Sequence, residues 1–444
     1  MHIQCTHGTP TVDTLDHLPP LPLLIHYSHT SVSIQGKDEM GIYHALRLHD
    51  RVRQIDLHLP PSILQKCLVL MDEHFPILQH LSLSFAGDKF TTLTLPKAFL
   101  ALNLRHLALP SFSPPKRLRF LTSTVSLVTL VLRNIQKSSY FRPKLLASRL
   151  LSLPQLEELS IGFSSPIPRP SAERELLGEP GIPITLPNLK TLKFQGISAY
   201  LESFVAQIRV PLLNRVDITL FNQIAFALPH LFHLINIPEG FKLPTSEIFL
   251  FFDRDGVSIV MAHHDILQRY DDPFRLLVKC KQLDWQIDCA AQICSMLIPT
   301  PTDVERLTLE FYDTTPPSEL QDGGIDCTTW VELLNSFIGV KELHVCDGLL
   351  KELSRALQVD GVESNPGFLP NLQYIICVPS GNDLFTSFID ARRVTGHQIQ
   401  FLSPQAWRRR IINQLNRTKF ICPDCDRCKY NFDSFFFRDA NVSF

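Results

Sequence analysis

The pattern L-x-x-L-x-L recurs along this chain of 444 residues, and it constrains the fold more than any other feature of the sequence. Looser copies begin at Val52, near Thr245, at Cys280 and at Leu372. From Val52 to Leu372 the copies follow one another at about 29 residues each, the upper edge of leucine-rich spacing. The clearer copies span residues 78–83, 104–109, 127–132, 156–161, 189–194, 213–218, 304–309 and 340–345.

Each copy predicts a short strand, because its apolar fourth and sixth positions alternate with polar third, fifth and seventh positions. Helical periods follow between strands, as at Leu201, Phe204 and Ile208, and Pro143 is expected to open another helix. Such units cannot bury their apolar faces alone, so they stack. We therefore predict an α/β fold. It is a leucine-rich-repeat solenoid, an irregular horseshoe with short parallel strands on its concave face and helices or loops on its convex face.

The repeats divide the chain into three predicted regions. Residues 1–48 are a lead-in segment, residues 49–402 form the solenoid, and residues 403–444 form a basic, cysteine-containing tail that we expect to be poorly ordered. Asp253-Arg254-Asp255-Gly256 lies between two apolar runs and predicts a hairpin inserted near residues 247–261. A proline that stops the preceding helix stands two residues before five of the copies, at Pro76, Pro154, Pro187, Pro211 and Pro370.

Composition excludes several classes of protein. With 45% hydrophobic and 19% charged residues, the chain is neither disordered nor collagen-like. A formal net charge of −2 offers no global field for nucleic acid or an anionic membrane, so neither is an expected partner. The sequence shows no membrane span and no signal peptide, and its scattered single cysteines suit a reducing compartment. We expect an intracellular protein, cytoplasmic or nuclear.

Several longer strings are more specific than the repeat itself. They include Cys5-Thr6-His7-Gly8-Thr9-Pro10, Arg51-Val52-Arg53-Gln54-Ile55-Asp56-Leu57 and Ala391-Arg392-Arg393. Over residues 1–402 the chain resembles the leucine-rich-repeat region of mushroom-type fungal F-box proteins. The resemblance implies a substrate-holding array, joined in that family to a helical F-box that binds a Skp-type adaptor of a cullin ubiquitin ligase. As in that family, the ninth repeat position is not asparagine but, for example, Ile135, so the turns need other partners for their backbone groups.

The F-box normally precedes the Cys-Thr-His-Gly string, and only four residues precede that string in this sequence. We therefore expect the adaptor-binding half to be missing, so that a Skp-type adaptor is a partner only if a longer form carries an F-box. Leu59-Pro60-Pro61-Ser62-Ile63-Leu64 resembles the opening of an F-box, but its place directly after the first strand favours a repeat helix. The expected partner is a protein target whose identity the sequence does not give.

The outward positions of the strands are the predicted recognition surface, because solenoids present an extended concave face there. Their mixed charges suit a protein or peptide partner, and the face lacks the basic stripe with stacking aromatics that nucleic acid requires. An ordinary solvated sheet face is the alternative interpretation of any single residue. The predicted partner-binding residues are Asp56, His58, His80, Arg133, Glu158, Lys193, Arg215, Asp217, Asp284, Arg306, Glu310, Glu342 and His344.

Cys422, Cys425 and Cys428 form the sharpest isolated motif, because thiolates at this spacing can share one zinc ion. Zinc takes four ligands and only three are local, so we favour free thiols over a metal site and predict no cofactor. Trp407-Arg408-Arg409-Arg410 is interpreted as a solvated helix start rather than a nuclear import or anion-binding patch. His263-His264-Asp265 is interpreted as the exit of the hairpin.

Motifs for catalysis are missing from the sequence. It contains no G-x-G-x-x-G, no G-x-x-x-x-G-K-[ST] and no G-x-S-x-G, so we predict that the protein is not an enzyme. The leading hypothesis is a non-catalytic interaction protein that resembles the substrate-recognition part of an F-box subunit of a cullin-type ubiquitin ligase. The alternative is a zinc-binding interaction protein that uses the C-terminal cysteine cluster. A third hypothesis is an enzyme with a dispersed site, which would need a deep pocket with converging ionisable groups of perturbed pKa.

Overall fold

The computed structural model divides into two compact units. Unit 1 comprises Met1–Phe221 and Ala227–Lys242, and unit 2 comprises Asn222–Phe226 and Leu243–Phe444. The division falls within the region predicted as one solenoid. The structure describes residues 2–8, 15, 17, 19–28, 36–85, 93–112, 121, 124–166, 183–223, 225–236, 246–262, 273–297, 304–311, 327–358, 368–407 and 409–410.

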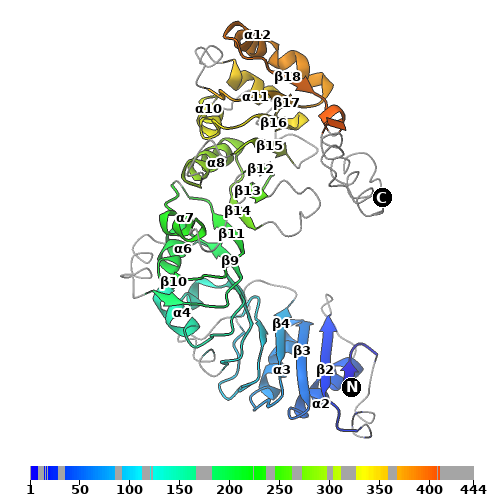
Figure 1. Ribbon diagram of the computed structural model, residues 1–444. Coiled ribbons are helices and arrows are strands. Elements are labelled where there is room, and N and C mark those ends of the chain that lie inside the picture. Colours follow the sequence, from blue (N-terminus) through cyan, green and yellow to red (C-terminus); the bar gives the residue numbers. More distant parts are fainter. Residues whose placement is uncertain are drawn as a thin grey trace, which may run out of the picture. The chain divides into compact units, whose positions relative to one another are not determined.

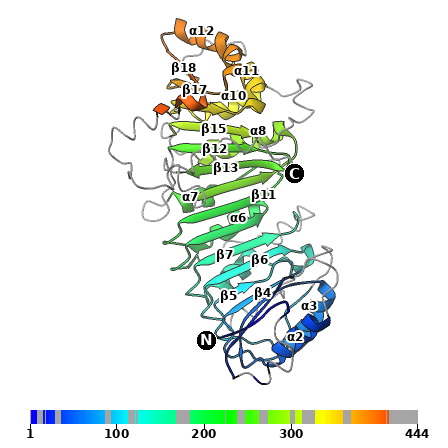
Figure 2. The ribbon, with the colours of Figure 1, turned by 90° about the vertical axis from the view of Figure 1, so that its right-hand side faces the viewer.

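Unit 1 is built on a parallel sheet whose strands follow one another in chain order (Figure 1). Figure 2 looks onto the strands from β4 to β11, which lie side by side. The two strands β1 and β2 come from the predicted lead-in segment and pair in parallel with each other and with β3. The sheet contains β1 (Ile3–Cys5), β2 (Leu23–Ser28), β3 (Val52–Leu59), β4 (His80–Phe85), β5 (His106–Ala108), β6 (Thr129–Ile135), β7 (Glu158–Phe163), β9 (Thr191–Gly196) and β11 (Arg215–Phe221).

The predicted alternation of buried and exposed positions is confirmed in unit 1. Most intervening positions remain in contact with solvent, because successive side chains of a strand point to opposite sides of the sheet; β7 is the exception, where Ser160 is 2% exposed. The recurring leucines therefore form one apolar layer behind the strands. The fourth and sixth positions of the copies are at most 4% exposed at Leu81, Leu83, Leu107, Leu109, Leu130, Leu132, Leu159, Ile161, Leu192, Phe194, Val216 and Ile218.

Helices cover this apolar layer. Pro61 and Pro143 stand at helix starts, where the fixed φ of proline suits the first turn and its missing N–H costs nothing. Figure 1 shows α4, α6 and α7 along one side of β9 and β11. A small parallel sheet pairs β8 (Ile184–Thr185) with β10 (Ile208–Arg209). The helices are α2 (Gly36–Arg47), α3 (Pro61–Leu70), the 3₁₀ helix η2 (Lys137–Ser139), α4 (Pro143–Leu150), α6 (Ser198–Val205) and α7 (Pro229–Ile235).

The prolines before the strands stand at the second position of a tight turn. The carbonyl of Leu153, which precedes Pro154, accepts a backbone hydrogen bond from Leu156 at 3.2 Å. Proline favours this position because its φ is preset. Asparagine side chains then link one turn to the turn before it, as where Asn188 Nδ2 donates to the Pro154 carbonyl at 2.8 Å. Asn103 and Asn371 donate in the same way to Pro76 and Ile338. These side-chain amides serve as hydrogen-bond donors to the turn carbonyls. The ninth repeat position is not asparagine in this chain and so does not provide such donors.

Unit 2 joins an antiparallel meander to a parallel sheet. The turn between β12 and β13 lies where the hairpin is predicted, and Asp253 Oδ1 closes it by accepting bonds from the N–H groups of Asp255 at 2.7 Å and Gly256 at 2.8 Å. β12 pairs antiparallel with β13, and β13 pairs antiparallel with β14. Parallel pairing then runs from β12 through β15, β16 and β17 to β18. The strands are β12 (Glu247–Phe252), β13 (Gly256–Ala262), β14 (Phe274–Lys279), β15 (Arg306–Phe311), β16 (Glu342–Val345), β17 (Tyr374–Ile376) and β18 (Gln400–Leu402).

Helices of unit 2 lie along one side of β12 to β17 (Figure 1). Trp330 of α10 is fully buried and meets Phe252 of β12 edge-on, with ring centroids 5.8 Å apart. Within the described residues, no helix is both long enough and apolar enough to cross a membrane. The helical segments are α8 (Leu283–Leu297), α10 (Cys327–Asn335), η4 (Asp347–Leu349), α11 (Leu350–Leu357), η5 (Pro379–Phe385) and α12 (Thr386–Val394).

The prediction of a repeat strand beginning at Cys280 is wrong. Strand β14 ends at Lys279, and helix α8 occupies the place of the predicted strand. Leu283 and Ile287 share a helical face and are at most 2% exposed, whereas Trp285, an inward position of the predicted strand, is 55% exposed. Asp284 therefore lies in the first turn of a helix, where a carboxylate is favourable. It is not part of a sheet face.

Candidate functional site

Many predicted site residues lie together on the solvent-facing side of the unit 1 sheet, which we call the polar face. Backbone register aligns their side chains in rows that cross the strands. One row contains Gln54, His80, His106, Thr129, Glu158, Thr191 and Arg215, and the next contains Asp56, Ser82, Ala108, Val131, Ser160, Lys193 and Asp217. His58 aligns with Ser84 farther along the strands, and its Nδ1 lies 2.7 Å from the Ser84 hydroxyl.

From β6 to β9, polar side chains of the face form ion pairs and hydrogen bonds with one another. Lys193 Nζ lies 2.7 Å from Glu158 Oε1 on the neighbouring strand. Arg133 Nε donates to the Ser160 hydroxyl at 2.9 Å, which places this predicted residue on the same face. Half-exposed ion pairs of this kind contribute at most about 1 kcal/mol to folding. They order the face without leaving a strong local charge.

A further row, which we call the edge row, lies where the strands begin. Its residues are connected by a ladder of backbone hydrogen bonds, such as those from Gln79 N to the Arg53 carbonyl and from Arg105 N to the Gln79 carbonyl, both 2.8 Å. Lys190 in this row pairs with Glu157 at 2.9 Å. The edge row contains Arg53, Gln79, Arg105, Val128, Glu157, Lys190 and Asn214.

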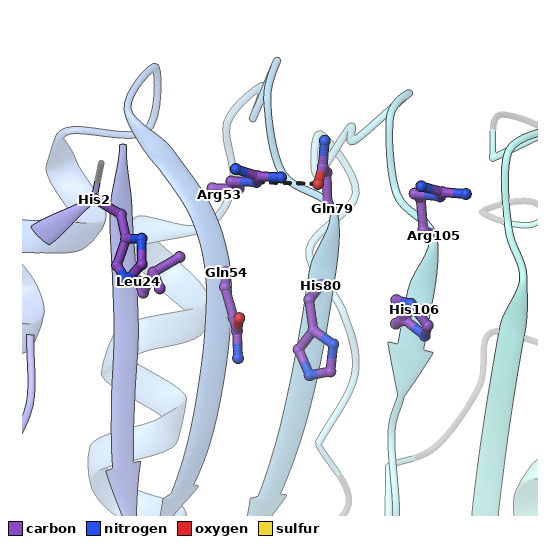
Figure 3. Close-up of a pocket in the computed structure, with 8 residues that line it drawn as sticks. All are labelled: His2, Leu24, Arg53, Gln54, Gln79, His80, Arg105 and His106. Carbon is purple, nitrogen blue, oxygen red and sulfur yellow. Dashed lines mark hydrogen bonds between the residues drawn. The ribbon is translucent and has the colours of Figure 1, made fainter. Parts of the chain in front are cut away.

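Arg53 and Arg105 border a recess of about 440 Å³ in unit 1. Figure 3 shows Arg53, Gln79 and Arg105 at the end where the strands begin, with Gln54, His80 and His106 next along the strands. His2 and Leu24 complete the lining. Arg53 Nε donates to Gln79 Oε1 at 3.0 Å, which orients the guanidinium. In the part of the chain that the structure describes, neither arginine has an acidic partner.

The histidines of the recess lie close to one another. The rings of His80 and His106 are 5.5 Å apart between centroids. Burial lowers the pKa of His80, the neighbouring His106 lowers it further, and Asp56 opposes both effects. Asp56 is itself 2.9 Å from His26 Nδ1. At neutral pH the imidazole of His80 therefore adds little to the positive charge of Arg53 and Arg105.

Sequence analysis identified only His80 of the recess. Arg53 and Arg105 stand at the second position of their copies, outside the alternation from which the recognition surface is predicted. His2 precedes the repeats altogether. The sequence does show an arginine at the second position of two nearby copies. Only the pairing register of the strands shows that these two positions lie at one edge of the sheet.

In unit 2, the predicted residues Arg306 and His344 are buried rather than open to a partner, each being 6% exposed. Arg306 lies between two carboxylates, with Nε 2.8 Å from Glu342 Oε2 and Nη1 3.2 Å from Glu247 Oε1. The Trp407 ring lies 5.0 Å from the guanidinium carbon of Arg306, and its Nε1 donates to Glu342 Oε2 at 3.1 Å. The prediction of an open binding face is therefore wrong for these residues. Glu310 of β15 remains half-exposed.

The interpretation of Trp407 as part of a solvated helix start is also wrong. Its ring is 6% exposed and packs with Ile376, Tyr374 and Leu402 over the face of β17 and β18. Arg410 donates to the Tyr374 hydroxyl at 2.8 Å. A large aromatic side chain gains more by covering an apolar patch than by remaining in water. The first residues of the predicted tail thus close this side of unit 2.

The hydrogen bonds and charges among Arg306, Glu342 and His344, beneath Trp407, determine which of these side chains are ionised. Burial alone would raise the pKa of Glu342, but the nearby His344 and the charge and hydrogen bond of Arg306, together with the Trp407 N–H, lower it to about 2. Burial also lowers the pKa of His344, whose Nε2 is 3.7 Å from Glu342 Oε2. Glu342 is therefore ionised and paired at neutral pH.

Comparison with solved structures finds a likeness to the leucine-rich repeat-containing protein LegL7 from Legionella pneumophila. The two share 14% sequence identity with a TM-score of 0.28, and the match covers 89% of this chain and 98% of that chain. No protein-family model matches the chain, and no curated protein matches it. A likeness at this TM-score carries no functional conclusion, so the function proposed below depends on the geometry of the faces.

Metal binding finds no support within the described residues, where no group of three or more His, Cys, Asp or Glu side chains is placed to hold an ion. The cysteines Cys422, Cys425 and Cys428 lie outside the described residues, so the zinc hypothesis stays a prediction. The residues His263-His264-Asp265 lie outside them as well. Metal analysis of the purified chain, with and without residues 411–444, tests zinc binding and leaves Trp407 in place.

Proposed function

We propose that the polar face of unit 1 binds a segment of another protein. The observation that carries this proposal is the register, which sets rows of mainly polar and mainly half-exposed side chains across parallel strands above a fully buried apolar layer. Side chains held on strands are positioned more rigidly than side chains on loops, so they can form a preorganised surface. The alternating charges of Glu158, Lys193 and Asp217 suit the mixed polarity of a protein partner.

A finer proposal concerns the biological setting. We propose that the two units are parts of a leucine-rich-repeat solenoid and that its face recognises substrates of a cullin-type ubiquitin ligase. The support for this setting is the sequence resemblance to the repeat region of fungal F-box proteins. Fusion of an F-box upstream of Met1, followed by reconstitution with a Skp-type adaptor and the ligase core, should direct ubiquitin to a protein that binds the polar face. Equal modification of a protein that does not bind would contradict this setting.

Matched variants test the binding role. Peptides selected from a random displayed library against the purified full chain are expected to lose binding to Glu158→Ala/Lys193→Ala, which removes an ion pair of the polar face. The control Glu39→Ala/Lys66→Ala removes an ion pair of similar length, 2.9 Å, between helices α2 and α3. Surface plasmon resonance compares the variants, and circular dichroism checks their folding. Equal loss in both variants, or in neither, would mean that the polar face is not the binding surface.

A further inference from the structure

The arginines of the recess differ from the other cations in equivalent places. In unit 1, Lys190 of the edge row faces Glu157 on the next strand at 2.9 Å. In unit 2, Lys341 occupies the corresponding place before β16 and faces Glu305 at 2.6 Å. Arg53 has a neutral neighbour, Gln79, between itself and Arg105. Among the described positions of the edge row, Arg53 and Arg105 are thus the cations without an acidic partner, and both border the recess.

The spacing of these groups fits an extended chain. Neighbouring strands are about 4.8 Å apart, so residues two strands apart, such as Arg53 and Arg105, are separated by about 10 Å at the backbone. An extended peptide rises about 3.3 Å per residue and its alternate side chains share a face, so acidic side chains two residues apart lie about 7 Å apart on one face, within reach of both long arginine side chains. Imidazoles of His80 and His106 lie in the adjacent row, where they can donate to the same carboxylates. Leu24 supplies a small apolar wall at the other side.

We infer that this recess binds an acidic peptide segment, with carboxylates paired to Arg53 and Arg105 and hydrogen-bonded by His80 and His106. The inference rests on the proposed function and specifies the chemistry of the partner. Nucleic acid is disfavoured as the occupant because the recess carries no Phe, Tyr or Trp for base stacking, and because Asp56 lies in the next row along the strands. A phosphate chain would approach that carboxylate as it continued across the face.

Acid should strengthen this binding. The charged groups that act on His80 are Asp56 of β3 and His106 of β5, while Arg53, Arg105 and His2 also line the recess. In the free protein, burial and the adjacent imidazole disfavour the protonated form. A bound carboxylate favours that form and raises the pKa of His80. Protons are therefore taken up on binding, and the affinity rises as pH falls through the range in which the histidines titrate.

Fluorescence anisotropy with the full-length chain tests the inference directly. The probe is a fluorescein-labelled twelve-residue peptide of alternating Glu and Ala, and its matched control replaces every Glu with Gln. We expect binding of the Glu peptide only. The variant Arg53→Gln/Arg105→Gln should weaken it about tenfold, the effect of losing two exposed charge pairs. Lys190→Gln removes a cation from the same edge row outside the recess and should leave the affinity within about twofold.

Measuring the same binding as a function of pH separates the contribution of the histidines to the affinity from that of the arginines. Affinity of the wild-type chain should rise about tenfold from pH 7.5 to pH 5.5, near the imidazole pKa range. His80→Gln/His106→Gln should abolish most of that rise while both arginines remain. A flat pH response in the wild-type chain would overturn the role of the histidines. Equal binding of the Glu and Gln peptides, or an arginine variant that binds like the wild-type chain, would overturn the inference as a whole.

A further comparison keeps the two proposals distinguishable. If the Glu peptide does not bind but library peptides are still lost on Glu158→Ala/Lys193→Ala, the polar face binds proteins and only the acidic chemistry of the recess is wrong. If neither probe binds, the proposed function fails as well. Tighter binding of a single-stranded oligonucleotide than of the Glu peptide would contradict the assignment of an acidic peptide.

Discussion

Trp407 decides whether the face of unit 2 meets solvent. Its ring covers Arg306, its N–H reaches Glu342, and its apolar edge packs on Ile376. A single residue beyond the last recognised repeat thus converts predicted surface residues into an interior network. The position carries no repeat signal, which is why sequence periodicity does not find it.

Replacement of Trp407 by alanine should lower the free energy of unfolding by about 3 kcal/mol, the usual cost of removing a large buried aromatic side chain. Part of that loss reflects the Glu342 carboxylate, which loses a hydrogen bond. Trp285, which is 55% exposed on α8, provides the control, and Trp285→Ala should change the stability by less than about 0.5 kcal/mol. Urea denaturation followed by circular dichroism measures both. Similar values for the two variants would contradict the packing of Trp407.

Glu342 should make stability depend on acid pH. Its pKa in the folded chain is about 2, below the usual value of 4.5, so the unfolded chain binds the proton more readily. The carboxylate therefore stabilises the folded state above pH 4.5, and this stability is lost as pH falls toward 2. Glu342→Gln should be less stable than the wild-type chain at pH 6, by on the order of 2 kcal/mol, and the difference should shrink toward pH 3.

The control for this pH dependence is Glu305→Gln. Glu305 is 57% exposed and paired with Lys341 on the surface of unit 2. Its removal should shift stability little and evenly across the same pH range, because exposed pairs contribute little. Thermal unfolding between pH 6 and pH 3 compares the two variants. A constant difference between Glu342→Gln and the wild-type chain over that range would contradict the assignment of the low pKa.

At the scale of single elements, the outcome depends on how many signals agree. The strands of unit 1 are predicted because leucine alternation and the proline turn give the same boundaries, as at Pro154 and β7. The copy at Cys280 has the leucine spacing alone, and there the helical spacing of Leu283 and Ile287 prevails. Strand β14 is missed because Phe274, Leu276 and Val278 alternate without matching the repeat.

The hairpin of unit 2 should be sensitive to its glycine. A Cβ atom on Gly256 would lie 2.1 Å from the carbonyl oxygen of Val278 on β14, and that backbone oxygen cannot move without breaking the sheet. Gly256→Ala should therefore cost about 2 kcal/mol or more. At Gly348 the closest atom to a new Cβ is 3.5 Å away, so Gly348→Ala serves as the control. Hydrogen exchange of β13 and β14 amides measures the effect, and equal protection in both variants would contradict it.

At the scale of the whole molecule, the α/β architecture of parallel strands and covering helices follows from the sequence pattern, whereas the character of the surfaces does not. Periodicity shows which side of a strand faces out, as for Asp56 and Lys193. It does not show that Arg53 and Arg105 become neighbours in one edge row, since that requires the register between strands. It also does not show that the outward residues of unit 2 are covered. Composition alone cannot distinguish an open face from a closed one.

The recess and the Trp407 cluster should respond separately to mutation. The recess is lined by residues between His2 and His106, and the cluster is built on strands of unit 2. Substitutions without shared partners usually act additively. Trp407→Ala should therefore leave the affinity for the Glu peptide within about twofold, while Arg53→Gln/Arg105→Gln should leave urea stability unchanged within about 0.5 kcal/mol. A large loss of peptide affinity in Trp407→Ala, or a large loss of urea stability in Arg53→Gln/Arg105→Gln, would show that the two regions are coupled.

The edge row also bears on how such a protein acquires new partners. Each of its positions is fixed along the strand by a turn and across the sheet by backbone hydrogen bonds, neither of which depends on the side chain at that position. A single-codon change from Arg to Gln at residue 53 would thus alter the ligand chemistry at one point and leave every neighbouring point in place. Selection could therefore tune specificity one strand at a time, without insertions and with little effect on folding.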